Sequence, residues 1–156
     1  MKIAVYPGSF DPITNGHIDI LKRSLEVFDK VIILISKNPK KSGYFPVEVR
    51  KEMIEGALEE ANIQNVVVDI HEGLTVKYAK EHGAKHLIRG LRAVTDFEYE
   101  FQICSANEYA DKEVDMIFFM AHNDTSFISS SAILELHNNG VDVSKLVPTS
   151  VNKRLS

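Results

Sequence analysis

The sequence opens Met1-Lys-Ile-Ala-Val-Tyr-Pro-Gly-Ser-Phe-Asp-Pro-Ile-Thr-Asn-Gly-His17, and this stretch contains signals for three successive structural elements. Residues 2–6 form a short apolar run that predicts a buried strand. A loop rich in turn-forming residues follows it. Apolar residues then recur at helical spacing, at Ile18, Leu21, Leu25 and Phe28. The stretch therefore predicts a strand, a loop and a helix, which is the repeating unit of a parallel α/β sheet.

The same alternation continues along the chain. We expect strands at residues 2–6, 31–35, 66–70, 86–88 and 116–119. A second helix should begin near Pro46, with an apolar stripe at Val47, Ile54, Leu58 and Ala61. A third helix is expected over residues 74–82, between two glycines. These elements predict an α/β fold, a single doubly wound domain over residues 1–156 with a five-stranded parallel sheet. Its ligand site should lie at the carboxyl ends of the strands.

Composition narrows the class of protein. The 156 residues are 44% hydrophobic and 26% charged, which is typical of one compact cytoplasmic domain. No apolar run is long enough to cross a bilayer, and no secretion signal is recognisable. The net charge of −4 and the absence of a basic tract argue against nucleic-acid binding. Cys104 cannot form an internal disulfide, and its register with Phe97 and Phe101 predicts burial on an apolar helix face.

The loop after the first strand is the first candidate site. Gly8 allows the backbone to approach a ligand, and Pro12 stiffens the turn. Thr14 or Asn15 can cap the following helix, whose first N–H groups then point at an anion. His17 falls in that first turn, where an imidazole can donate to phosphate oxygens. A single histidine at this position is most often a surface residue, so the context carries the hypothesis.

Three further segments suit phosphate groups and follow other strands. Ser129, Ser130 and Ser131 open a helix after the last strand, although such a run is most often only a cap. Arg89 and Arg92 follow the fourth strand, and each guanidinium group can donate two hydrogen bonds to a separate phosphate. Asp96 and Glu100 come after them, at the start of a helix. Lys40 and Lys41 lie in a loop after the second strand. Taken together, these segments predict a polyphosphate site.

Other reaction classes lack their sequence signals. The chain has no serine elbow, no His/Cys spacing for a metal and no Gly-Lys-Ser/Thr phosphate loop. Hydrolase, zinc-enzyme and P-loop kinase chemistry are therefore disfavoured. A transfer reaction that needs only positioning and charge stabilisation remains.

The chain closely resembles the phosphopantetheine adenylyltransferases of the nucleotidylyltransferase superfamily. The resemblance runs from Met1 to about Pro148. It rests on the segment that ends Thr-Asn-Gly-His17, on Leu87-Ile-Arg-Gly-Leu-Arg-Ala-Val-Thr-Asp-Phe-Glu-Tyr-Glu100 and on Ser126-Phe-Ile-Ser-Ser-Ser131. It implies a Rossmann-like fold and the reaction of ATP with 4'-phosphopantetheine to give dephospho-coenzyme A and pyrophosphate. The substrate phosphate would attack the α-phosphorus directly, so no general base or covalent intermediate is needed.

The resemblance also implies roles for individual residues. Catalytic roles would fall to His17, Lys41 and Arg92. ATP would contact Ser9, Phe10, His17, Gly90, Leu91, Arg92, Glu100, Thr125, Ser126, Phe127, Ile128, Ser129, Ser130 and Ser131. The acceptor would contact Ser9, Lys41, Leu74, Thr75, Arg89 and Asn107. Mg²⁺ would be carried by the ATP phosphates, with no metal held by the protein, and the family implies a homohexamer inhibited by coenzyme A.

Two departures and two alternatives qualify this assignment. Ser9 stands where many relatives have threonine, which keeps the hydroxyl. Thr125 stands where an aromatic residue is usual, beside the unfamiliar His122 and Asn123, so nucleotide contacts there can differ. The alternatives are an adenylyltransferase for another phosphorylated acceptor, such as a mononucleotide, and a silent nucleotide sensor. The arginine motif with Glu100 disfavours the first alternative. The second is disfavoured because His17, Lys41, Arg92 and the serine segment are all intact.

Overall fold

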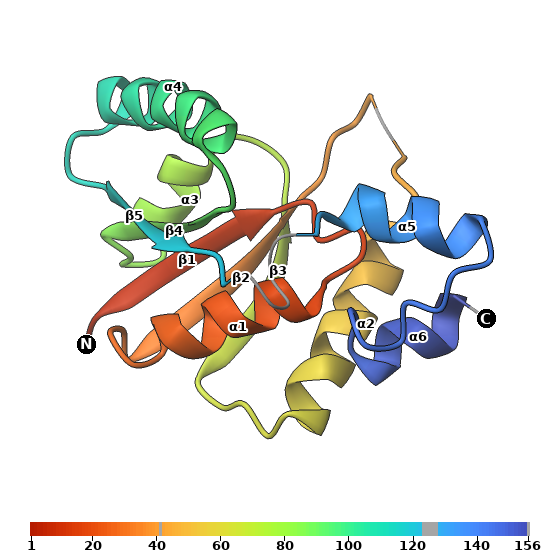
Figure 1. Cartoon of the computed structure of the whole chain (residues 1–156). Coiled ribbons are helices and arrows are strands. Elements are labelled where there is room, and N and C mark those ends of the chain that lie inside the picture. The colour runs from red at the N-terminus through yellow and green to blue at the C-terminus, as the bar shows by residue number, and fades with distance from the viewer. Residues whose placement is uncertain (41, 123–127, 156) are drawn as a thin grey trace.

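A five-stranded parallel sheet forms the centre of the computed structural model, which describes residues 1–40, 42–122 and 128–155 (Figure 1). The strands are β1 (Ile3–Gly8), β2 (Lys30–Ser36), β3 (Val66–His71), β4 (His86–Leu91) and β5 (Asp115–Met120). Their order in the sheet is β3-β2-β1-β4-β5, and all neighbours pair in parallel. The five predicted strands are confirmed, and β4 continues beyond its expected end at Ile88.

Helices cover both faces of this sheet. They are α1 (Asn15–Ser24), α2 (Val47–Glu60), α3 (Thr75–Glu81), α4 (Val94–Ala110), α5 (Ser130–Asn138) and α6 (Thr149–Leu155). Successive side chains of a strand point to opposite faces. Ala4 and Tyr6 of β1 therefore pack into a core with α1, α2, α5 and α6, while Val5 packs into a second core with α3 and α4. The predicted doubly wound arrangement is confirmed.

The order of the strands reverses beside β1. The chain moves outward from β1 through β2 to β3, then crosses to β4 on the other side of β1. Strands β1 and β4 pair at Ala4 with His86 and at Val5 with Leu87. In open α/β sheets, ligands bind at the carboxyl ends of the strands where the order reverses. The fold thus favours the ends of β1 and β4 as the ligand site.

Two helical features differ from expectation. The burial expected for Cys104 is met only in part, and the helix face used to predict it is not buried as a whole, because Phe97 and Phe101 of α4 are 50% and 59% exposed. The inner side of α4 is instead formed by Ile103 and Cys104, which are partly buried against the second core. Helix α6 has no counterpart in the sequence-based expectation. Among the described residues, no helix has both the length and the apolar character needed to cross a membrane.

Candidate active site

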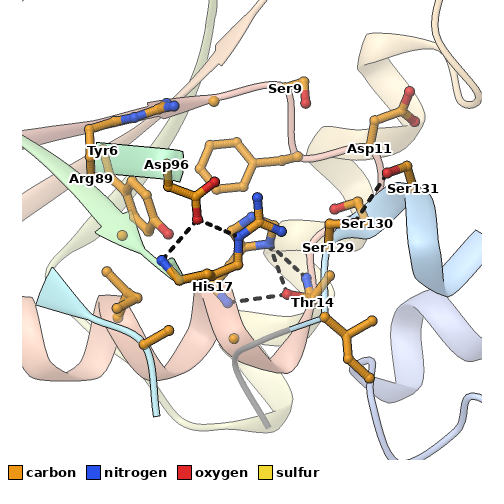
Figure 2. A pocket seen from close by; sticks show the side chains of 18 of the residues that line it. Tyr6, Ser9, Asp11, Thr14, His17, Arg89, Asp96, Ser129, Ser130 and Ser131 are labelled. Carbon is orange, nitrogen blue, oxygen red and sulfur yellow. Dashed lines mark hydrogen bonds and ion pairs between the residues drawn. The ribbon is translucent and has the colours of Figure 1, made fainter. Parts of the chain in front are cut away.

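A cavity of about 540 Å³ lies where the ends of β1 and β4 meet the N-terminal ends of α1 and α5 (Figure 2). Residues from three predicted motifs line it: Ser9, Phe10, His17, Arg89, Gly90, Arg92, Glu100, Ile128, Ser129, Ser130 and Ser131. These motifs are far apart in the sequence. The sheet topology therefore brings the first loop, the arginine segment and the serine segment to one site.

His17 lies in the first turn of α1 and is held there by Thr14. The Thr14 hydroxyl accepts the His17 backbone N–H at 3.3 Å and caps the helix. The Thr14 backbone N–H in turn donates to His17 Nδ1 at 2.9 Å. A ring nitrogen that accepts a hydrogen bond carries no proton, so the neutral ring has its proton on Nε2. Within the described part of the chain, Nε2 has no hydrogen-bond partner and remains available as a donor.

The protonation state of His17 follows from its surroundings. Burial lowers its pKa to about 4, and the positive charges of Arg92 and Arg89 act in the same direction. The imidazole is therefore neutral at pH 7. A neutral imidazole with a fixed tautomer is a hydrogen-bond donor that does not release a proton.

Aromatic rings fix the orientation of the His17 imidazole. The Phe10 ring lies edge-on to His17 with 5.0 Å between centroids, and Tyr6 packs edge-on to Phe10 at 5.2 Å. A Cβ at Gly8 would lie 3.1 Å from the Phe10 ring, so glycine allows the loop to fold this closely. Phe10 is only 2% exposed, and its ring is occupied by these contacts. What it can offer to a nucleotide is its backbone.

Arg89 and Glu100 form one unit at the end of β4. Arg89 Nη2 donates to Glu100 Oε1 at 2.6 Å, and Arg89 Nε lies 3.1 Å from both carboxylate oxygens. Arg89 Nη1 donates to the Pro7 carbonyl at 3.0 Å and so ties β4 to β1. The Glu100 side chain is 6% exposed, whereas that of Arg89 is 27% exposed. The pair therefore leaves the arginine, and not the carboxylate, as the accessible group.

Arg92 is the more accessible cation of this segment, with a side chain that is 40% exposed. Asp96 holds the turn before α4 by accepting the backbone N–H groups of Arg92 at 3.0 Å and Ala93 at 3.2 Å. Asp96 also lies 3.4 Å from Arg92 Nε. Asp96 and His17 both line the cavity (Figure 2). Arg92 thus supplies a positive charge at the cavity, and Asp96 fixes the position of its backbone.

The serine segment places the start of α5 against the first loop. The Ser129 hydroxyl accepts the Ala132 N–H at 3.2 Å and caps the helix, as expected for one of the three serines. The Ser130 hydroxyl donates to the Pro12 carbonyl at 2.8 Å. Ser131 lies 3.2 Å from Ser129, oxygen to oxygen. The N-terminal end of α5 is therefore fixed at the cavity, where its free N–H groups suit an anion.

Some predicted site residues lie elsewhere. Leu74 is 63% exposed and lines a separate, smaller cavity between α3 and the end of α4. Thr75 and Leu91 are not among the residues that line the main cavity. Asn107 Nδ2 lies 3.5 Å from Met116 Sδ instead. Four predicted residues fall outside the described part of the chain: Lys41, Thr125, Ser126 and Phe127.

Sequence reasoning missed a buried ion pair beside the cavity. Arg50 of α2 is 5% exposed, and its Nε lies 3.4 Å from Asp11 Oδ1 in the first loop. A signal was present, because Arg50 falls on the apolar stripe between Val47 and Ile54. A charged residue on a core-facing stripe indicates a buried partner. The sequence does not show which acidic residue that partner is.

The acidic residues that the structure describes at the site do not form a metal-binding cluster. No group of three His, Cys, Asp or Glu side chains suited to a metal ion occurs among residues 1–40, 42–122 and 128–155. Asp11, the carboxylate in the first loop, accepts the N–H groups of Tyr44 at 2.6 Å and Phe45 at 2.9 Å. The donors that face the cavity are instead a neutral imidazole, two guanidinium groups and helix N-termini. Such a set can bind polyphosphate and stabilise negative charge without a general base.

Comparison with known proteins agrees with this chemistry. The cytidylyltransferase-like family model matches residues 5–136. A phosphopantetheine adenylyltransferase of Thermotoga neapolitana is 48% identical over 98% of this chain and 94% of its own length. One from Desulfotalea psychrophila is 49% identical over 99% of this chain and 91% of its own length.

Solved structures support the fold. A putative nicotinate-nucleotide adenylyltransferase from Vibrio parahaemolyticus has a TM-score of 0.74 at 19% identity and covers 99% of both chains. A bifunctional NMN adenylyltransferase/ADP ribose pyrophosphatase from Francisella tularensis, complexed with AMP and a manganese ion, has a TM-score of 0.65 at 21% identity. The match covers 99% of this chain and 48% of the Francisella tularensis chain. At these identities the likeness concerns the fold alone.

Proposed function

Because the chain belongs to the phosphopantetheine adenylyltransferase family, we propose that it transfers AMP from ATP to 4'-phosphopantetheine by direct in-line attack. The products are dephospho-coenzyme A and pyrophosphate, which makes the reaction a step of coenzyme A biosynthesis. The observation that carries the mechanism is the neutral His17, whose Nδ1 is occupied by Thr14. Its Nε2–H can donate to an α-phosphate oxygen as negative charge develops there.

The acceptor supplies the nucleophile. A phosphate monoester is ionised at neutral pH, so the reaction needs no base to activate it. This requirement agrees with a histidine that donates and does not accept a proton. The protein has to hold the acceptor phosphate in line with the α-phosphate of ATP, and positioned cations offset the repulsion between these two anions. Arg92 and the accessible edge of Arg89 supply positive charge on the β4 side of the cavity.

Residue roles follow this division of the cavity. Arg89, which Glu100 orients, would bind the phosphate of the acceptor. Ser9 and the start of α5 would contact the phosphates of ATP. Lys41 would add a cation from the loop after β2. Leu74, Thr75 and Asn107 remain candidates for the pantetheine arm, although they lie outside the main cavity.

Magnesium would enter with ATP, held by the nucleotide phosphates. The carboxylate nearest the first loop, Asp11, is engaged by two backbone N–H groups and by Arg50. When bound, the ion would neutralise phosphate charge and ease departure of pyrophosphate. The chain's own residues then orient the α-phosphate and the acceptor.

A panel of acceptors tests this function. Pyrophosphate release from ATP should require 4'-phosphopantetheine and should be absent with nicotinate mononucleotide, flavin mononucleotide or glycerol phosphate. Release with only one of the latter would replace the proposed substrate. No release with any acceptor would refute adenylyl transfer.

The proposal extends to assembly and regulation. Exposed aromatic side chains on α4, namely Phe97, Phe101 and Tyr109, would be covered in the homohexamer that the family implies. Coenzyme A, which contains the product, would compete for the same cavity and inhibit. A cytoplasmic location, where ATP is available, completes the proposal.

A further inference from the structure

Arg50 connects three separate pieces of backbone beside the cavity. Its Nε donates to the Phe45 carbonyl at 2.8 Å, its Nη1 to the Ser9 carbonyl at 3.2 Å and its Nη2 to the Ser42 carbonyl at 3.1 Å. The guanidinium group thus uses all three nitrogens on backbone acceptors. It joins the loop after β1 to the segment that leads into α2.

Asp11 makes the reciprocal connection. Its carboxylate accepts the N–H of Tyr44 at 2.6 Å and the N–H of Phe45 at 2.9 Å, and it lies 3.4 Å from Arg50 Nε. Asp11 lines the cavity, and its side chain is 15% exposed. A carboxylate in an anion site would repel phosphate if its charge were not compensated. Here, Arg50 and two N–H groups compensate it.

Residue 43 fits this arrangement only as glycine. Gly43 has φ of +73°, a conformation that residues with a Cβ rarely adopt. A Cβ there would overlap the Arg50 guanidinium and lie 2.6 Å from Asp11 Oδ2. Segment 42–45 therefore packs directly on the ion pair.

We infer that Arg50 and Asp11 are a positioning pair that fixes segment 42–45 against the first loop and so holds the Ser9 and Phe10 backbone in place beside His17. The inference rests on the proposed function. Ser42 follows Lys41, the lysine proposed to contact phosphate, and Ser9 precedes Phe10, which packs on His17. Arg50 does not line the cavity, so it acts through these neighbours.

The expected effect is on turnover more than on binding. Misplacing a reacting group by about 1 Å can lower a rate by about 100-fold. Arg50→Met and Asp11→Asn should each lower kcat by at least ~10-fold, while the dissociation constant of ATP changes by less than ~3-fold. The kcat of Arg50→Lys should be close to that of Arg50→Met, because one ammonium group cannot replace a guanidinium group that donates to three separate carbonyls.

A second readout separates local anchoring from general stability. Amide hydrogen exchange at Tyr44 and Phe45 should accelerate at least ~10-fold in Asp11→Asn, because both N–H groups lose their anionic acceptor, with β2 amides unchanged. The matched control is Arg154→Met, which removes an ion pair of 2.5 Å between α6 and Glu52 of α2, away from the cavity. Its kcat should equal that of the unaltered protein.

Gly43→Ala provides an independent variant that keeps both charges. Its Cβ should displace segment 42–45 and reproduce the loss of kcat. Full turnover in Arg50→Met or Gly43→Ala would overturn the inference, as would full rescue by Arg50→Lys. Accelerated exchange throughout the sheet, with activity lost in proportion to stability, would also overturn it. Absent turnover in the unaltered protein would refute the proposed function instead, and the exchange data would still decide whether the pair anchors the segment.

Discussion

The backbone N–H of Thr14 points at Nδ1 of His17 across 2.9 Å, and this hydrogen bond decides which ring nitrogen carries the proton. The Thr14 hydroxyl lies 3.1 Å from the same nitrogen. One residue thus caps α1 and fixes the tautomer of the histidine three positions later. The consequence is a site in which His17 donates through Nε2 and does not act as a base.

The tautomer can be observed directly. In ¹⁵N NMR at pH 7, His17 should show an unprotonated Nδ1 and a protonated Nε2, because Nδ1 accepts a hydrogen bond. The spectrum of His17→Gln assigns the signals. A proton on Nδ1, or a mixture of the two neutral forms, would contradict the assignment.

Acid should weaken the fold through His17. Its pKa falls from 6.5 to about 4 on folding, so between these values the unfolded chain binds one more proton than the folded chain. The contribution of His17 to stability is complete above pH 6.5 and is lost as the pH falls towards 4. A shift of this size corresponds to about 3 kcal/mol.

Urea unfolding at pH 7.5 and pH 5 measures this contribution. The unaltered protein should lose more free energy of unfolding between the two pH values than His17→Gln, which cannot titrate at this position. Equal losses in both proteins would show that His17 does not have the depressed pKa.

Removing the charge of Glu100 should leave Arg89 without its ionic partner. We expect Glu100→Gln to lower the free energy of unfolding by about 2 kcal/mol, less than for a fully buried pair because Arg89 is 27% exposed. The KM for 4'-phosphopantetheine should rise more than the KM for ATP, since Arg89 is proposed to bind the acceptor.

Glu52→Gln is the matched control for this measurement. Glu52 pairs with Arg154 on the surface, where the two side chains are 61% and 46% exposed. Loss of this surface ion pair should lower the free energy of unfolding by less than about 1 kcal/mol. An equal cost for both substitutions, with no change in either KM, would contradict the role given to Glu100.

The aromatic side chains of α4 should mediate self-association. The double substitution Phe97→Asp/Phe101→Asp should reduce the mass measured by light scattering, because it places two charges on the proposed interface. Val27→Asp alters a comparably exposed side chain (54%) in the turn after α1 and should leave the mass unchanged. A monomeric unaltered protein would remove the basis for the hexamer.

The strands and the location of the site could be predicted because their signals are local. Apolar runs followed by loops indicate parallel strands, and a threonine before His17 indicates a helix start. The topology rule then places the loops at one edge of the sheet. No structural detail was needed for these steps.

Two other features depend on contacts between distant segments. The partner of Arg50 is decided by how α2 packs beside the first loop, which the spacing of apolar residues does not determine. Helix α6 packs closely on α2, where a Cβ at Gly56 would lie 2.9 Å from the Ser150 Cβ. It is short, so tertiary packing rather than propensity stabilises it.

An apolar helix face is ambiguous for a different reason. Phe97 and Phe101 have the spacing of a buried stripe, yet their side chains are exposed to solvent in the single chain. Side chains that pack against another subunit have the same pattern as side chains that pack in a core. Sequence periodicity reports that a surface is apolar and not what covers it.

The central claim is that His17 stabilises the transition state through Nε2–H without acting as a base, and His17→Ala tests it most directly. With saturating ATP and 4'-phosphopantetheine, kcat should fall at least ~100-fold, the scale for losing one transition-state donor. The dissociation constant of ATP should change by less than ~3-fold. Equal losses in ATP binding and in turnover would contradict the claim, because they would show that His17 acts on the ground state.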